Sequence, residues 1–193
     1  MKMELKYILM TVVIISLIVI SIVIAKKTNQ SISTDPITSF YSLEANLISG
    51  EAVKMNQYKG KKIMIVNVAS ECGLTPQYSE LEELYKKYSE KLIILGFPSN
   101  DFFGQEPGSN EDIISFCSSK YLITFPLFEK IKVKGSKKHH VYDWLTDPSQ
   151  NGWNKKGPSW NFTKYLIDEN GKLVKRFSPR TTPLSPSIIE SLE

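Results

Sequence analysis

The sequence predicts an α/β sandwich, in which helices cover both faces of a small mixed sheet. Two apolar runs without alternation, residues 63–66 and 92–95, are typical of parallel strands that are buried on both faces. The segment between these runs has the spacing of a helix, which gives a strand–helix–strand unit. Near the end of the chain, residues 168–171 separate two strand-like runs and predict a hairpin.

The elements follow in order from these signals. Residues 61–70 and 91–100 contain the central strands, and Pro76 opens a helix after Thr75. A second helix begins after Ser109, which together with Asp112 resembles a capping box. Residues 185–192 predict a closing helix. The apolar face of the first helix contains Tyr78, Leu81, Leu84, Tyr85 and Tyr88, and that of the second contains Ile113, Ile114, Phe116 and Cys117.

The first 27 residues differ in composition from the rest. Residues 8–25 carry no charge and have lysines on both sides, and a helix of this length just spans the hydrocarbon core of a bilayer. A cleaved signal peptide has a shorter apolar region and a small-x-small cleavage site, which residues 23–25 do not supply. We therefore expect an uncleaved transmembrane helix at 1–27, a linker at 28–36 and one domain at 37–193. The alternative is a signal peptide and a secreted or periplasmic domain, and the flanking lysines leave the membrane orientation open.

The charge pattern argues against nucleic acid as a partner. The 193-residue chain has a formal net charge of +4, and its lysines and arginines are scattered among acidic residues. His139 and His140 are adjacent and lack a third ligand at a suitable spacing, so we expect no metal site. No cofactor is expected.

Cys72 lies in "NVASECGLTPQY", at the end of a predicted strand and just before a helix. The positive end of the helix dipole and free backbone N–H groups favour a thiolate at such a place. A thioredoxin-type dithiol would have its second cysteine where this chain has Thr75. A single reactive thiolate can still attack a peroxide and become a sulfenic acid. The alternative is a passive, half-buried thiol.

Four motifs in the same order resemble the glutathione peroxidase family: "NVASECGLTPQY", "GFPSNDFFGQEPGSNEDIISFC", "ITFPLFEKIKVKG" and "WNFTKYLID". The resemblance runs from about residue 38 to the C-terminus. It implies a thioredoxin-like fold and a thiol peroxidase that reduces hydrogen peroxide and organic or lipid hydroperoxides in oxidative stress defence. Members with sulfur in place of selenium use a peroxidatic cysteine, and the matching residue here is Cys72.

The resemblance also implies partners for Cys72, namely Gln105, Trp160 and Asn161. Their N–H donors can hold a thiolate and the peroxide oxygens without a charged base. The alternatives are a turn glutamine, a core tryptophan and a turn-stabilising asparagine. A second Trp-Asn pair, at 153–154, lacks the "FTK" that follows in the family.

Cys117 matches the resolving cysteine of thioredoxin-dependent members. In that role it attacks the sulfenic acid of Cys72 and forms a disulfide that thioredoxin reduces, and its helix must partly open. The alternative is a small buried apolar residue. Tetrameric members hold glutathione with a basic residue where this chain has Gln77, so we prefer thioredoxin to glutathione as reductant.

The chain also departs from the family pattern. Ser99 stands where many relatives have cysteine, and Asp101 adds a carboxylate near the expected site. The short segment before "WNF" resembles the monomeric members, so we expect a monomer. Two other functions stay open: a redox relay that passes oxidation to a partner protein by disulfide exchange, and a binding module without catalysis.

Overall fold

The computed structural model describes residues 38–193. The anchor expected at residues 1–27 and the linker at 28–36 lie outside the described residues. Within residues 38–193, none of the helices combines the length and the apolar character that crossing a bilayer requires.

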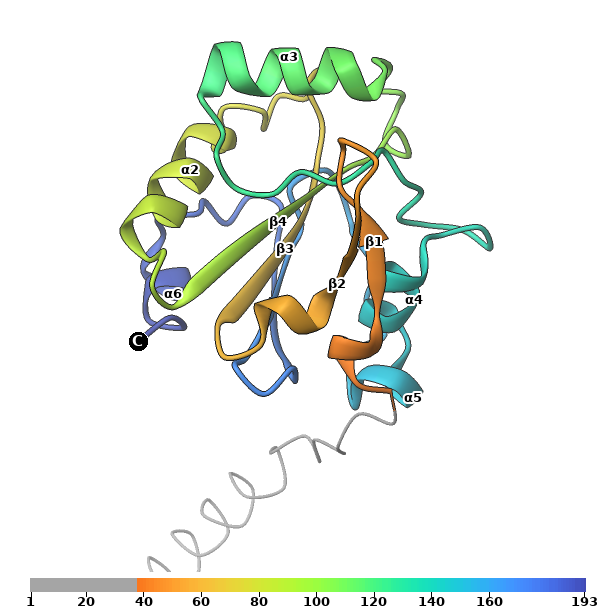
Figure 1. Ribbon diagram of the computed structural model, residues 1–193, viewed down its shortest axis with the longest axis vertical. Helices are drawn as coiled ribbons and strands as arrows, with labels where there is room; N and C mark the ends of the chain where they lie inside the picture. The colour runs from red at the N-terminus through yellow and green to blue at the C-terminus, as the bar shows by residue number, and fades with distance from the viewer. Residues whose placement is uncertain (1–37) are drawn as a thin grey trace, which may run out of the picture. The chain divides into compact units, whose positions relative to one another are not determined.

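The sheet has four strands in the order β4-β3-β5-β6 (Figure 1). Strands β3 (Lys62–Val68) and β4 (Leu92–Pro98) are parallel, as the two continuous apolar runs predicted. Strand β5 (Lys164–Ile167) is antiparallel to β3 and forms the predicted hairpin with β6 (Leu173–Phe177). The mixed sheet is therefore confirmed.

Successive residues of β3 supply two separate apolar cores, because side chains alternate between the faces of a strand. Ile63 and Ile65 pack on one side of the sheet, whereas Met64 and Val66 pack on the other. The first side is covered by α4 (His140–Thr146) and by a small second sheet of β1 (Glu44–Asn46) and β2 (Ala52–Lys54). The second is covered by α2 (Gln77–Lys87), α3 (Asn110–Tyr121) and α6 (Pro186–Ile189). Helices on both faces of the sheet are thus confirmed.

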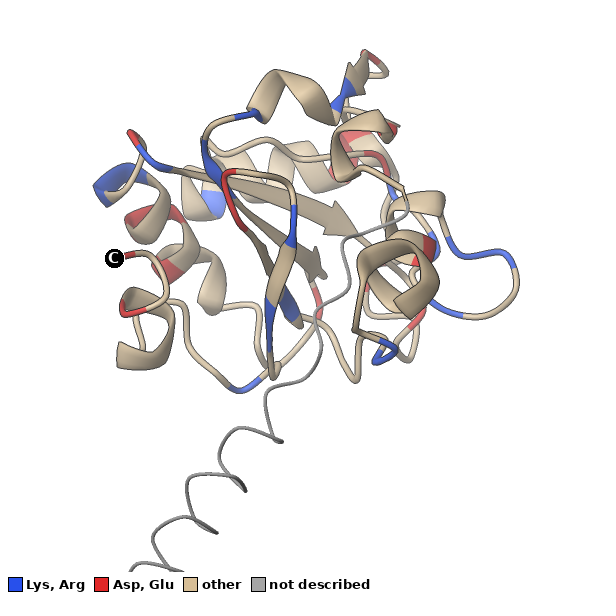
Figure 2. Ribbon diagram, turned by 90° about the horizontal axis from the view of Figure 1, so that it is seen from below, with Lys and Arg blue, Asp and Glu red and all other residues tan. Residues whose placement is uncertain are grey.

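Three short helical segments complete the described chain. The 3-10 helices η1 (Phe40–Ser42) and η2 (Met55–Tyr58) flank the small sheet, and α5 (Pro148–Asn151) follows α4. Basic and acidic residues are interspersed over the ribbon (Figure 2), in line with the scattered charges of the sequence.

The helix that bears Cys117 begins as predicted but buries a narrower face. The Ser109 side chain accepts from the Asp112 backbone N–H, and the Asp112 carboxylate accepts from the Ser109 N–H, which completes the capping box. Ile113 and Cys117 are both 1% exposed, whereas Ile114 is 40% exposed. The prediction that Ile114 shares the buried face is wrong. Helix α3 packs against the rest of the domain mainly through Ile113 and Cys117, which are four residues apart and therefore lie on the same side of the helix.

Two other boundaries differ slightly from the predictions. Helix α2 begins at Gln77 with Pro76 as its N-cap, and α6 covers only Pro186–Ile189 of the predicted 185–192. His139 is the N-cap of α4, where its ring accepts from the Val141 N–H. Among residues 38–193 no cluster of three or more His, Cys, Asp or Glu side chains is arranged to hold a metal ion.

Candidate active site

Cys72 lies in the loop between the end of β3 and the start of α2. It is 7% exposed, and its Sγ accepts from the Leu74 N–H at 3.4 Å. The Cys72 N–H donates to Thr75 Oγ1 at 3.0 Å, and the Thr75 hydroxyl donates to the Ala69 carbonyl at 2.8 Å. A turn therefore separates Cys72 from α2, and the amide that contacts the sulfur belongs to this turn rather than to the helix.

Cys72 opens into a cleft of about 710 Å³. Four segments form its walls: the loop of Cys72, the loop after β4, and the two chain stretches around residues 160 and 179. The lining residues are Cys72, Gly73, Leu74, Gln105, Ser159, Trp160, Ser178, Pro179 and Arg180.

Gln105 and Asn161 form a hydrogen-bonded pair beside the cleft. Asn161 is fully buried, and its Nδ2 donates to Gln105 Oε1 at 2.9 Å. Because the Gln105 side-chain oxygen is already an acceptor in this bond, its amide nitrogen is left to donate toward the cleft. The Gln105 carbonyl accepts from the Glu71 N–H at 3.0 Å, which joins this loop to that of Cys72. Asn161 contacts the cleft residue Gln105 but does not itself line the cleft.

Trp160 lines the cleft and packs against two aromatic rings. Its ring centroid lies 5.6 Å from that of Phe102 and 5.4 Å from that of Phe103, which is 87% exposed. The Trp160 carbonyl accepts from Asn67 Nδ2 at 3.0 Å and from the Thr163 hydroxyl at 2.9 Å. These bonds to β3 and to the start of β5 hold the tryptophan turn in place.

The structure brings Cys72, Gln105, Trp160 and Asn161 together, but it keeps Cys117 apart from the cleft. Cys117 is buried in the same apolar core as Cys72, and neither thiol is in a disulfide. Burial raises the pKa of the Cys117 thiol from 9 to about 11, an effect that the nearby Tyr78 hydroxyl only partly offsets. Cys117 is therefore protonated and enclosed in this conformation.

Three further residues discussed from the sequence, Asn154, Asp101 and Gln77, have their side chains bonded to other parts of the protein. Asn154 of the second Trp-Asn pair is buried and donates to the Leu145 carbonyl, away from the cleft. The Asp101 carboxylate accepts from the backbone N–H groups of Val133 and Lys134, so it holds the segment at 133–134. Gln77 is buried, with its side chain bonded inside the protein.

Three residues near the site were not singled out from the sequence. Thr75 positions the Cys72 backbone, Arg180 lines the cleft, and Lys164 is buried below it. The signal for Lys164 was its presence in "WNFTKYLID", where a lysine begins an otherwise apolar strand. Its contacts depend on residues distant in sequence, so the motif alone did not assign it a role.

Comparisons with known proteins show the family and the fold of the chain. The model of the family described as "Glutathione peroxidase" matches residues 40–146. The chain is 54% identical over 149 residues to glutathione peroxidase-like peroxiredoxin 2 of Saccharomyces cerevisiae, which covers 77% of this chain and 92% of the relative. The crystal structure of apo Trgpx is 35% identical, with a TM-score of 0.61, over 81% of this chain and 96% of that one. A thioredoxin family protein from Chlorobium tepidum shares the fold at 14% identity, with a TM-score of 0.53, over 82% of this chain and 97% of that one.

Proposed function

Because this chain belongs to the glutathione peroxidase family and is a peroxidase with a thioredoxin-like fold, we propose that Cys72 is its peroxidatic residue. One observation supports this assignment above the others: the Cys72 sulfur reaches a cleft that Gln105 and Trp160 also line. A passive core cysteine would not need hydrogen-bond donors on the same surface.

The first half-reaction uses the Cys72 thiolate as nucleophile. The sulfur attacks one peroxide oxygen, an S–O bond forms and the O–O bond breaks, which yields the Cys72 sulfenic acid and an alcohol or water after uptake of one proton. The amide of Gln105 and the indole N–H of Trp160 stabilise the negative charge on the departing oxygen. Asn161 keeps the Gln105 amide in the donating orientation through its bond to Oε1.

The second half-reaction uses Cys117 as the resolving cysteine. Its sulfur attacks the sulfenic acid sulfur, the S–S bond forms, and the hydroxyl group leaves as water with the thiol proton. Cys117 is 1% exposed and outside the cleft, so α3 must open before the two sulfurs meet. Thioredoxin then reduces the disulfide by thiol exchange.

The buried side chain at position 77 supports thioredoxin over glutathione. The Gln77 amide donates to the Pro179 carbonyl, and its oxygen accepts from Lys164. Because Gln77 is 6% exposed and both polar atoms of its side chain are bonded inside the protein, it does not present a donor at the surface for a glutathione carboxylate. The protein reductant needs only an accessible disulfide.

The cleft supports organic hydroperoxides as substrates in addition to hydrogen peroxide. Leu74, Trp160 and Pro179 give it apolar walls, and its volume of about 710 Å³ is within the range of small-molecule sites. Arg180 adds a positive charge at the same surface. We also infer that the enzyme acts as a monomer. Because residues 8–25 form an uncharged run long enough to span a bilayer, we infer that residues 1–27 attach the enzyme to a membrane.

A turnover assay of the purified chain tests the proposal. With hydrogen peroxide and thioredoxin, the wild type should consume peroxide steadily, while Cys72→Ser should lose turnover because a hydroxyl is a far poorer nucleophile than a thiolate. Asn161→Ala should slow the oxidation of Cys72 about 10- to 1000-fold, by analogy with the loss of one oxyanion donor.

Three results would count against parts of this proposal. Substantial activity in Cys72→Ser would remove the peroxidatic assignment. One stoichiometric oxidation of the wild type followed by a stall would favour the redox relay, and glutathione-driven turnover without thioredoxin activity would reverse the choice of reductant.

A further inference from the structure

Lys164 is a fully buried lysine in β5 that has no part in the reaction steps above. Its Nζ donates to Gln77 Oε1 at 2.5 Å, to the Phe162 carbonyl at 2.8 Å and to the Pro179 carbonyl at 3.4 Å. An ammonium group has three N–H donors and no acceptor, so three acceptors suit its protonated form.

The three acceptors belong to the segments that enclose Cys72. Pro179 lines the cleft, and Phe162 directly follows the turn with Trp160 and Asn161. Gln77 is the first residue of α2 and comes directly after the turn that holds Cys72. The Gln77 amide also donates to the Pro179 carbonyl at 2.8 Å, which closes the network. A single nitrogen atom thus connects three parts of the site.

The backbone conformation of Phe162 shows how the bonds of Lys164 affect the geometry of the site. Its φ of 66° lies in the left-handed region, which a residue with a side chain adopts at an energetic cost. The Phe162 N–H donates to the Asn67 carbonyl at 2.6 Å, and its own carbonyl accepts from Lys164. Such a conformation persists only where neighbouring groups hold it in place. Here the Asn67 carbonyl holds the Phe162 N–H and the Lys164 ammonium holds the Phe162 carbonyl, so Lys164 supplies one of the two hydrogen bonds.

We propose that Lys164 is a positioning residue for the peroxide reaction, because its buried side chain holds the Trp160–Asn161 turn, the Pro179 wall and the start of α2 in place around Cys72. The proposal rests on the function assigned to Cys72 above. It predicts that loss of the Lys164 side chain loosens the cleft and slows Cys72 oxidation even when the domain stays folded.

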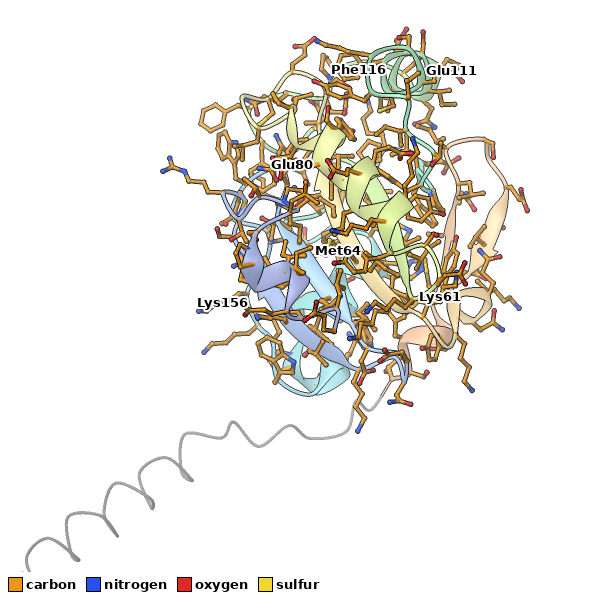
Figure 3. All side chains as sticks on the ribbon, turned by 90° about the vertical axis from the view of Figure 1, so that its left-hand side faces the viewer. Lys61, Met64, Glu80, Glu111, Phe116 and Lys156 are labelled. Atoms are coloured by element: carbon orange, nitrogen blue, oxygen red, sulfur yellow. The ribbon has the colours of Figure 1, made fainter. Side chains whose placement is uncertain are left out.

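The surroundings of Lys164 also predict a dependence on pH. Burial lowers the pKa of Lys164 to about 7, and the Glu80 carboxylate on α2 opposes this effect. Figure 3 labels Glu80, whose Oε2 accepts from the Leu184 N–H and does not contact Lys164 directly. Val66 and Phe177, the strand partners of Lys164, are apolar. As the pH rises through about 7 the ammonium becomes an amine with two N–H donors, so one of the three acceptors loses its bond.

The first test compares Lys164→Met with Lys62→Met in the full chain. Lys62 is a matched control because it also lies in the sheet and donates to a backbone carbonyl, that of Ser191, but at the end of β3 away from Cys72. We expect amide hydrogen exchange in residues 159–163 and 178–181 to be at least about 5-fold faster in Lys164→Met than in the control. We expect the single-turnover rate of Cys72 oxidation by hydrogen peroxide to fall about 10- to 100-fold, since small displacements of reacting groups have effects of this size.

The second test uses Gln77→Glu and does not depend on whether Lys164→Met folds. A carboxylate next to Lys164 favours its ammonium form, so the three bonds should persist at higher pH. The ratio of exchange rates in residues 159–163, wild type over Gln77→Glu, should rise about 3-fold or more between pH 6 and pH 8.5. Gln77→Glu also loses the bond that the Gln77 amide donates to the Pro179 carbonyl, but this loss does not vary with pH. Because both proteins also share the same intrinsic exchange rates in residues 159–163, the change of the ratio with pH reports Lys164.

The outcomes separate this inference from the proposed function. Exchange in Lys164→Met equal to that of the control, or a ratio for Gln77→Glu that stays constant with pH, would overturn the positioning role. Wild-type chain that fails to consume peroxide would instead overturn the function of Cys72, and the exchange measurements would still decide whether Lys164 holds the cleft.

Discussion

The step in which Cys117 attacks oxidised Cys72 should depend steeply on pH. Cys117 must react as a thiolate, and burial raises the pKa of its thiol from 9 to about 11. A rise of this size lowers the thiolate fraction near neutral pH about 100-fold relative to an exposed thiol, because each pKa unit is a factor of ten. The enclosed conformation therefore protects Cys72 sulfenic acid from immediate resolution.

The expected result is a rate constant for disulfide formation that rises about tenfold per pH unit between pH 6 and pH 8, since the thiolate fraction rises in that proportion below the pKa. The assay is a single pulse of hydrogen peroxide, followed by acid quenching, thiol blocking and mass spectrometry of the Cys72–Cys117 disulfide. The upper end of the profile distinguishes two mechanisms. A rise that continues past pH 9 indicates that Cys117 loses its proton while it is still enclosed and α3 opens afterwards, whereas a plateau near pH 9 indicates that α3 opens first and exposes a thiol with its ordinary pKa.

Cys117→Ser is the matched control for this experiment. It should consume one equivalent of peroxide, lose thioredoxin-driven turnover and become prone to irreversible overoxidation of Cys72. A disulfide rate that is constant from pH 6 to pH 8 would refute the thiolate argument. Normal turnover of Cys117→Ser with thioredoxin would show that Cys117 is a core residue only.

Two further substitutions test the framework of the site. Gly96→Ala should lower the free energy of unfolding by about 1–3 kcal/mol in a thermal or denaturant melt, because the new Cβ would lie 2.7 Å from Leu127 Cδ2 and 3.1 Å from Cε2 of the buried Phe125 ring. An unchanged melt would mean that both side chains move aside at little cost. Thr75→Val should slow the oxidation of Cys72 in the single-turnover assay, because it removes the acceptor of the Cys72 N–H and the donor to the Ala69 carbonyl. Thr75→Ser keeps both bonds and should react close to the wild-type rate, and equal rates for Val and Ser would leave Thr75 without a role in positioning.

Much of the fold could be predicted from local signals in the sequence. The continuous apolar runs of β3 and β4, the turn between β5 and β6, and the capping box at Ser109 each need only neighbouring residues to be recognised. The small sheet of β1 and β2 was missed because each strand has three residues and a single buried one, too few to show alternation. Ile114 was misassigned because four apolar residues in the five positions 113–117 do not indicate which of them faces the core.

The residues of the candidate site fall into two groups: those that could be expected from the sequence, and those whose role depends on contacts that only the fold creates. Cys72 was expected from its place between a strand and a helix, whereas Gln105, Trp160 and Asn161 were expected only from the resemblance of their motifs to a known family. The bond between Asn161 and Gln105 joins positions 56 residues apart, so only the fold shows that one orients the other.

Gln77 shows how contacts in the fold change the role that a residue is assigned from the sequence. From the sequence, Gln77 marks the loss of a basic residue that tetrameric relatives use to hold glutathione. In the structure its oxygen accepts from Lys164, which lies 87 positions later and is fully buried. A lysine or arginine at position 77 would place a second cation against this ammonium, with no carboxylate in direct contact with Lys164 to offset the repulsion. An uncharged residue that accepts from Lys164 and donates to Pro179 is therefore compatible with a buried lysine. The proposed reductant and the proposed positioning role of Lys164 thus both depend on the side chain at position 77, and the reductant assay and the Gln77→Glu exchange measurement test them separately.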